Sequence, residues 1–409
     1  MRHSLQNRVR VLKAIVDRNA RASRTEIAAQ TGLSLTTLSR ITSSLVSKGI
    51  IFESGGEESK KKRRVRGPRP RPLSVRSYLG YSIGVDVEGM AVRAVVIDFA
   101  NCIHQKVKKD LPDQADSHQI ADAVGHAIED VAAMSHIPAD RIVGIGMGLP
   151  GAACRPDSAE ADWPYLGEGV CKRLEDRLGR EICDAVSTEH NMRCFALAEQ
   201  RLGKLAGCPA GAVLVSRYGV GVAFVRDGVA QVGETAPTGE IGHSVICDGG
   251  HRCRCGQRGC LEAYSAAWAL NKQWRKRRGL KTTEDTMRGE GLRELLQGAA
   301  DKDPVLLEVV REGAHSLGIA IGNLSNIYGA RTIVVHGIYS LFGRTIHQVI
   351  EDTARQHIRH AYMDEVRVCF SELGEFAGSM GAALLARDKN FAVYVSDRVL
   401  NHTANDMSE

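Results

Sequence analysis

The sequence contains no long apolar run. None of its apolar stretches approaches the roughly 18 residues that a membrane span needs, and its N-terminal residues include no apolar segment of signal-peptide type. Cysteine is thinly spread, at 11 of 409 positions, which argues against a disulfide scaffold. These absences predict a cytoplasmic protein with reduced thiols and no membrane partner. The length and a hydrophobic content of 43% leave room for two or three domains around a large core.

Positive charge is concentrated at one end of the chain. Residues 1–77 hold 18 Lys/Arg against 5 Asp/Glu, a local charge of +13, whereas the whole chain carries only +6, which leaves −7 for the remaining residues. A basic head on a mildly acidic body favours contact between the head and a polyanion. The alternative is a solvated basic tail without a partner.

Residues 5–51 carry the pattern of a small helical domain. Ser23 and Glu26 fit the Ser-x-x-Glu capping box that opens a helix, and Gly32 suits a tight turn before the next helix. Ser34 can cap that helix, which has one apolar face and one face of short polar side chains with an arginine. Such side chains can approach base edges and phosphates in a major groove. The DNA contacts predicted here are Ser34, Thr36, Thr37, Ser39, Arg40 and Ser43.

The run "SRTEIAAQTGLSLTTLSRITSSLVSKGII" resembles the winged helix-turn-helix of bacterial transcription factors, with "LVSKGII" leading into the wing. Glycines, a dense basic run and three prolines follow, which is typical of a wing turn and a partly extended linker. The basic side chains can neutralise phosphates or enter a minor groove, or they can belong to a linker whose charge only aids solubility. The contacts predicted in this run are Lys60, Lys61, Lys62, Arg63, Arg64 and Arg66.

From Tyr78 onward, strand patterns alternate with helix patterns. The segments "LGYSIGVDVEGMAVRAVVIDFANCI" and "AGAVLVSRYGVGVAFVRDGVAQ" each predict a strand, a turn and a second strand. "ADAVGHAIEDVAAM" predicts a helix, and "RIVGIGMGLPGAA" predicts a buried strand that ends in a glycine-rich loop. This alternation predicts an α/β body with its binding loops at the strand ends.

Residues 78–385 resemble the ROK family, which groups sugar kinases with sugar-responsive repressors. The matching segments are "GVDVEG" (84–89), "GIGMGLPG" (144–151), "GEIGH" (239–243), "CRCGQRGCLE" (253–262) and "IGNLSNIYGARTIVVHG" (321–337). The resemblance implies a two-lobed α/β actin-like ATPase fold, of the ribonuclease H-like type, with a ligand cleft between the lobes. A basic head in front of such a body is the layout of the repressor branch of the family.

One histidine and three cysteines cluster in the matching segments. His243, Cys253, Cys255 and Cys260 offer one nitrogen and three sulfurs, which suits a closed tetrahedral Zn²⁺ site without an open position for catalytic water. The resemblance implies the same ligand set, with a structural role for the zinc. His251 is a rival to His243 as the fourth ligand.

The resemblance also implies a carbohydrate site beside the metal. In the family, the residues that match Glu240, His243 and Glu262 hydrogen-bond sugar hydroxyls, and carboxylates are good acceptors for vicinal hydroxyls. His190 and Asn191 occupy the place of an Asn-Asp pair that contacts sugar in the family. Gly151, which ends "GIGMGLPG", completes the predicted sugar set.

The segments that handle nucleotide in the family's kinases are altered. Glu88 stands at a glycine position of the first phosphate loop, where its carboxylate would repel the γ-phosphate. Arg217 and Tyr218 replace the Gly-Thr that opens the second loop, and "HGI" (336–338) replaces a Gly-Gly. Phosphate cradles need small residues because the backbone N–H groups must approach the ligand. These changes predict that ATP use is lost.

The catalytic base of the kinases is also missing. Their aspartate matches Asn191, which cannot accept a proton at neutral pH, and His190 lies one residue away. We therefore predict no catalytic residues and a body that only senses a ligand. Asn191 can still hydrogen-bond a sugar hydroxyl.

The predicted organisation has four parts: a winged helix-turn-helix with basic wing or linker (1–76), a first α/β lobe (77–190), a second α/β lobe with the zinc knot (191–390) and a C-terminal tail (391–409). The predicted function is sugar-responsive repression of carbohydrate genes, with a double-stranded DNA operator, a sugar effector, structural zinc and a homodimer or tetramer. The alternatives are an active sugar kinase with an added DNA-binding head and a nonspecific nucleic-acid binder.

Overall fold

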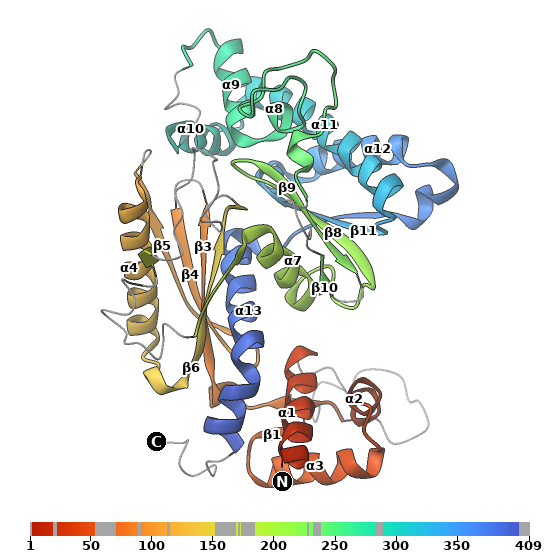
Figure 1. Cartoon of the computed structure of the whole chain (residues 1–409). Helices are drawn as coiled ribbons and strands as arrows, with labels where there is room; N and C mark the ends of the chain where they lie inside the picture. Colours follow the sequence, from red (N-terminus) through yellow and green to blue (C-terminus); the bar gives the residue numbers. More distant parts are fainter. Residues whose placement is uncertain are drawn as a thin grey trace.

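The computed structural model describes residues 2–18, 23–53, 71–88, 91–112, 115–151, 169–170, 172, 185–226, 229–231, 239–282 and 289–400. A helical head is followed by two α/β lobes (Figure 1). Within these ranges, no helix is both long and apolar enough to cross a bilayer.

The described residues of the head form three helices and one strand pair: α1 (Arg2–Asp17), α2 (Arg24–Thr31), α3 (Leu35–Ser47), β1 (Ile51–Glu53) and β2 (Leu73–Val75). The predicted helix-turn-helix corresponds to α2, Gly32 and α3. The predicted capping box opens α2: Ser23 Oγ accepts from the Glu26 N–H, and Glu26 Oε2 accepts from the Ser23 N–H. Gly32 ends α2 with φ +68°, a left-handed conformation that glycine adopts without strain. β1 and β2 pair antiparallel on either side of residues 54–70.

The first lobe is built on a five-stranded sheet in the order β5-β4-β3-β6-β7. Its strands are β3 (Tyr81–Glu88), β4 (Ala91–Asp98), β5 (Ile103–Asp110), β6 (Ile142–Leu149) and β7 (Val186–His190). The pairs β3–β4 and β4–β5 are antiparallel, whereas β6 runs parallel to β3 and β7 runs parallel to β6. Helix α4 (Ser117–Ser135) covers one face of this sheet and buries Ile120, Val124 and Val131 against it.

The second lobe repeats this topology, with the strand order β10-β9-β8-β11-β12. Its strands are β8 (Ala210–Ser216), β9 (Val220–Arg226), β10 (Val229–Ala230), β11 (Thr332–Gly337) and β12 (Arg367–Phe370). One face is covered by α8 (Glu262–Ser265), α9 (Ala267–Arg277), α10 (Gly289–Ala300), α11 (Pro304–Tyr328) and α12 (Gly343–His357). The repeated hairpin followed by two parallel strands confirms the predicted two-lobed α/β architecture.

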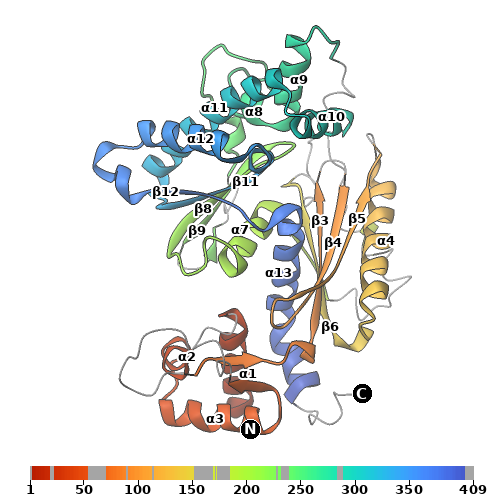
Figure 2. The same cartoon turned by 180° about the vertical axis from the view of Figure 1, so that it is seen from behind.

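Two helices connect the lobes. Helix α7 (Asn191–Leu202) packs on the second face of the second sheet and also against α13 (Ala377–Tyr394) (Figure 2). Helix α13 lies along β3 and β6 of the first sheet, so the predicted range 191–390 includes a helix that packs on the first lobe. A Cβ atom at Gly381 would lie 1.7 Å from Cys194 O, so α7 and α13 touch backbone to backbone.

The last described residues of the chain pack on the head. After α13, the turn Val395–Leu400 continues in π-helical form, and residues 401–409 lie outside the described part. Phe391, Tyr394 and Val399 share one hydrophobic cluster with the core of α1, α2 and α3. The head is therefore docked on the body rather than held by the linker alone.

Candidate functional site

The two predicted phosphate loops are joined by an ion pair between the lobes. Arg217, in the turn between β8 and β9, places Nη1 2.5 Å from Glu88 Oε2 and 3.5 Å from Asp86 Oδ2 at the end of β3. The side chains of Arg217 and Glu88 are only 13% and 15% exposed, and that of Asp86 is fully buried. Glu88 and Arg217, two separate departures from the kinase pattern in the sequence, are partners in the structure. We name Asp86, Glu88 and Arg217 the phosphate side.

Burial controls the charge of this region. Desolvation, followed by the charge of Glu88, raises the pKa of Asp86 to about 7, although Arg217 and Arg93 oppose the shift. Burial, followed by the charges of Arg217 and Arg93, lowers the pKa of His336 to about 3, so this imidazole is neutral at physiological pH. A Cβ atom at Gly378 would lie 2.6 Å from the Asp86 carboxylate, so α13 packs directly against it.

The ring of Tyr218, at the second predicted phosphate loop, contacts an arginine of the cysteine-rich segment. Arg254, from the cysteine-rich segment, lies with its guanidinium carbon 4.5 Å from the ring centre of Tyr218 and 5.5 Å from that of Trp268. Such distances are favourable for cation–π contact. Trp268 Nε1 donates to Glu262 Oε1 at 3.3 Å, so the turn and the cysteine-rich segment are held together.

His190, Asn191 and Gly151 meet where β6 and β7 end. His190 caps α7, because its Nδ1 accepts from the Met192 N–H at 3.2 Å. Its Nε2 faces Gly151, where a Cβ atom would approach to 2.9 Å. Burial lowers the pKa of His190, and Asn191 is 8% exposed. A neutral imidazole and an amide at the carboxyl ends of parallel strands can donate to and accept from hydroxyl groups.

His243 ends the short helical turn η5 (Ile241–His243), and Glu240 is the residue directly before this turn. His243 Nε2 lies 3.8 Å from Glu240 Oε2, while His243 Nδ1 lies 3.8 Å from Cys253 Sγ. The two ring nitrogens therefore face different partners, one carboxylate and one thiol. The side chains of Glu240 and His243 are 51% and 38% exposed, in contrast to the phosphate side. We name Gly151, His190, Asn191, Glu240 and His243 the sugar side, because the sequence predicts that they contact sugar; they form two groups, one at the start of α7 and one at η5.

The four predicted metal ligands converge. His243, Cys253, Cys255 and Cys260 each offer an atom, and these atoms lie within 4.8 Å of one another. Cys255 Sγ and Cys260 Sγ are 3.7 Å apart. Two thiolates on a tetrahedral Zn²⁺, each about 2.3 Å from the ion, lie at about this separation. The donor set and its spacing therefore fit a zinc ion.

Local backbone geometry and charge also favour a cation here. Gly259 has φ +82°, and a Cβ atom there would lie 1.9 Å from Cys247 O. Only glycine fits this turn, which brings Cys260 back to Cys255. Burial raises the pKa of Cys253 and of Cys260, so a bound cation is needed to hold them as thiolates. The rival ligand His251 instead stacks on Tyr264, with ring centres 4.5 Å apart.

Glu262, predicted as a sugar ligand, connects the start of β9 to α9 by hydrogen bonds. Its carboxylate accepts from the Val220 N–H at 3.3 Å and from the Trp268 indole, and the residue is 6% exposed. Its sugar contact stays a prediction, whereas its contact with the turn that carries Arg217 is direct. This structural role could not be predicted from the sequence, because the hydrogen-bond partners lie on separate elements.

The predicted DNA-contacting helix presents its polar face outward. Ser34 caps α3 by accepting from the Thr37 N–H at 3.2 Å. Leu38, Ile41 and Leu45 are buried in the head. The remaining predicted contacts on α3 are exposed, apart from half-buried Thr37: Thr36, Ser39, Arg40 and Ser43. The basic run Lys60, Lys61, Lys62, Arg63, Arg64 and Arg66 lies outside the described residues.

Comparison with known proteins agrees with this arrangement. The model of the ROK family matches residues 82–389, and a winged helix-turn-helix DNA-binding model matches residues 5–51. The chain therefore belongs to the ROK family and carries a DNA-binding head in front of the family's body.

The similar proteins include both repressors and sugar kinases. The xylose repressor of Caldicellulosiruptor bescii is 24% identical over 92% of this chain and 94% of its own length. The glucokinase of Halalkalibacterium halodurans is 26% identical but covers only 75% of this chain and 95% of its own. The crystal structure of a ROK family transcriptional regulator, a homolog of the E. coli Mlc protein, superposes with a TM-score of 0.71 at 20% identity over 98% of this chain and 100% of that one. This last likeness shows the fold.

Proposed function

We propose that this chain is a sugar-responsive, DNA-binding transcriptional repressor whose body binds its ligand without catalysis. The observation that carries the proposal is the buried ion pair between Arg217 and Glu88. It joins the two loops that cradle nucleotide phosphates in the kinases that this chain resembles. The head that precedes this body also extends the match to the xylose repressor over nearly the whole chain.

Phosphoryl transfer needs a phosphate cradle and a group that accepts the proton of the substrate hydroxyl. The charged side chains of Arg217 and Glu88 occupy the position of the phosphate cradle. Asn191 stands at the position of the proton acceptor, and an amide cannot accept that proton. His190 is held as the cap of α7. A buried, neutralised ion pair keeps the lobes in contact without nucleotide, which suits a receptor better than a kinase.

The effector is a sugar or sugar derivative that contacts the sugar side through Glu240, His243 and Asn191. Zn²⁺, bound by His243 and the three cysteines, fixes the imidazole so that its second nitrogen stays oriented toward Glu240. This role is structural, because the protein supplies all four ligands.

The protein acts in the cytoplasm as a homodimer or a dimer of dimers, so that paired heads bind two half-sites of one operator. The genes under that operator serve carbohydrate uptake or catabolism. A ligand changes operator affinity only through its different affinities for two arrangements of the protein. A coupling of about 1–3 kcal/mol gives roughly a 5- to 150-fold change.

The decisive experiment measures both activities on one preparation. Purified protein is incubated with MgATP and D-xylose, D-glucose or N-acetyl-D-glucosamine, and DNA binding is measured with a duplex that the protein enriches from a random-sequence pool. We expect sequence-specific binding and no phosphorylated sugar. Turnover near the 1–100 s⁻¹ typical of kinases would establish the kinase alternative instead. Equal affinity for all duplexes with a steep salt dependence would establish the nonspecific binder.

A further inference from the structure

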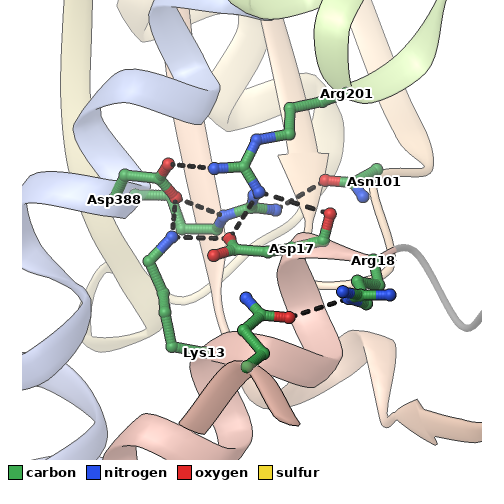
Figure 3. Close-up of polar contacts among 8 residues, drawn as sticks. Lys13, Asp17, Arg18, Asn101, Arg201 and Asp388 are labelled. Carbon is green, nitrogen blue, oxygen red and sulfur yellow. Dashed lines mark hydrogen bonds and ion pairs between the residues drawn. The ribbon is translucent and has the colours of Figure 1, made fainter. Parts of the chain in front are cut away.

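A charged cluster joins the DNA-binding head to the body (Figure 3). It contains residues from α1 in the head and from α7 and α13 in the body. We name it the junction cluster: Lys13, Asp17, Arg201, Arg387 and Asp388. None of these residues belongs to the predicted DNA, sugar or metal sites.

Arg201 is the member that connects all three helices. Its Nη1 lies 2.7 Å from Asp17 Oδ1 and also donates to the backbone carbonyl of Asp17 at 3.3 Å. Its Nη2 lies 3.2 Å from Asp388 Oδ2 on α13. Lys13 completes the bridge, with Nζ 2.6 Å from both Asp17 Oδ1 and Asp388 Oδ1. Because Asp17 is the last residue of α1, Arg201 also interacts with the negative end of the helix dipole.

The side chains of the junction cluster are largely shielded from solvent, so their ion pairs are weakened less by water than exposed pairs are. The side chains of Arg201, Asp17 and Asp388 are 19%, 17% and 21% exposed. Burial alone would raise the pKa of Asp388, but Arg387, Lys13 and Arg201 together hold it below its usual value. Exposed ion pairs contribute little, whereas a shielded network with several partners orients the elements that it joins.

One member is incompletely satisfied. Arg387 is 1% exposed and donates from Nη1 to Asn101 Oδ1 at 2.5 Å. Its Nε lies 3.6 Å from Asp388 Oδ1, beyond good hydrogen-bond distance, and its Nη2 has no partner among the described residues. Buried donors of this kind favour any rearrangement that satisfies them. An open hollow of about 260 Å³ lies beside the cluster between α1, α2 and α13 and is lined by Lys13, Thr31, Asp388 and Phe391 among others.

Both body helices of the cluster begin at the site between the lobes. Helix α7 starts at Asn191 and carries Arg201 ten residues later, about 15 Å along the axis. Helix α13 places Gly378 against Asp86 and Asp388 ten residues further on. Backbone contact at Gly381 ties the two helices together. A movement of the lobes at the sugar side therefore displaces Arg201 and Asp388 as one unit.

We propose that Arg201 is a positioning residue that transmits the state of the sugar side to the DNA-binding head. The inference rests on the proposed function, since it presupposes a ligand between the lobes and DNA on the head. Arg201 touches neither ligand. It holds the end of α1 against α7 and α13, so the orientation of the head follows the body.

The test uses the full chain and the enriched duplex as its probe. Coupling is reciprocal, so DNA bound to the head must alter α7 as well. Hydrogen exchange is measured for wild type, R201M and D17N, with and without duplex. Lys204→Met is the matched control, because Lys204 lies just beyond α7 and pairs with exposed Glu372 of the body, not with the head.

We expect the duplex to protect α1–α3 in all four proteins. In wild type and K204M it should also change exchange in α7 about 5-fold or more, the lower end of typical couplings, and this change should disappear in R201M and D17N. Any sugar of the panel that alters operator affinity in wild type should then alter it less than about 2-fold in both variants, while its own affinity is retained.

An exchange response of α7 that persists in both R201M and D17N, or that is absent already in wild type, would overturn the inference and leave the proposed function intact. A wild-type protein that binds no duplex would instead refute the proposed function. Thermal unfolding of each variant identifies a folding defect, and the two substitutions approach the same ion pair from opposite sides.

Discussion

The two sides of the site between the lobes balance their charges in opposite ways. On the phosphate side, Asp86 is buried, and the charge of Arg217 faces the carboxylates of both Glu88 and Asp86 in a largely shielded position. On the sugar side, Glu240 is half exposed beside His243, whose other nitrogen faces the thiols. Buried charges need internal partners, whereas an exposed carboxylate remains available to a ligand. The difference predicts that the phosphate side serves mainly stability and that Glu240 on the sugar side is accessible to a ligand.

The proposed metal knot should produce the largest effect, because His243, which lies beside Glu240, is one of its four candidate ligands. Cys255→Ser removes one of four ligands. Metal binding and folding are coupled at such sites, so we expect loss of nearly all bound zinc and aggregation or a much lower Tm. Elemental analysis and thermal unfolding measure both. Cys247→Ser, an exposed cysteine of the same segment outside the ligand set, is the control. Unchanged zinc content in C255S would refute the ligand assignment.

Substitutions on the phosphate side should lower the stability of the protein rather than its response to ligand. Arg217→Met leaves Asp86 and Glu88 without their shared cation, and removing one partner of a buried pair costs about 3–5 kcal/mol. Urea unfolding gives the value. The double variant R217M/E88Q should recover part of it, because no unpaired charge remains at position 88. Arg344→Met, at an arginine side chain that is 76% exposed, should change stability by less than about 0.5 kcal/mol. A similarly small effect of R217M would remove the contrast between the two sides.

Substitutions on the sugar side should abolish the response to ligand and leave stability unchanged. Glu240→Ala should leave folding and operator binding unchanged, because the side chain is 51% exposed. A sugar at 100 times its Kd stabilises wild type by about 2.7 kcal/mol, and we expect this increment to vanish in E240A. A thermal-shift titration measures it, with Glu240→Gln testing whether the charge or the hydrogen bonds matter. A variant that still responds at wild-type concentrations would show that Glu240 does not bind the ligand.

The last effect concerns pH, and its change in stability is spread over several pH units. The folded-state pKa of Asp86 is raised to about 7, above that of an unfolded aspartate, so the folded protein holds this proton where the unfolded chain has lost it. The contribution of Asp86 to stability is therefore greatest at low pH and is lost as the pH rises from about 4 to 7, by at most about 1.4 kcal/mol per pH unit. Asp86→Asn should flatten this part of the unfolding profile, whereas K204M should not. An identical profile in D86N would place the proton elsewhere.

Local signals allowed much of the head and the knot to be predicted. Ser23, Glu26 and Gly32 act within one or two helical turns, so the capping box and the turn follow from spacing alone. The cysteine spacing likewise predicted that the three thiols meet, because a short glycine-containing loop brings its own ends together, whereas the choice of His243 followed from the family resemblance. The alternating strand and helix patterns predicted the two lobes.

Long-range partners could not be predicted in this way. Glu88 and Arg217 are 129 positions apart, and the sequence marked each only as a departure from the kinase pattern. Glu262 faces Trp268 and a backbone amide across a turn, a contact that the family pattern does not encode. The range 391–409 was predicted only as a C-terminal tail, yet its residues Phe391, Tyr394 and Val399 belong to the hydrophobic cluster of the head.

The sequence by itself determined the class of each part: a basic helical head, an α/β body, a thiol-rich knot and altered phosphate loops. The first three features depend on composition, periodicity and short-range spacing, which act before the chain is compact, and the altered loops follow from the resemblance to the ROK family. Only the tertiary structure decided which charges neutralise one another, namely Arg217 with Glu88 between the lobes and Arg201 with Asp17 between body and head. The physical reason is that the strength of an ion pair depends on distance and burial, and both are fixed only when distant segments pack together.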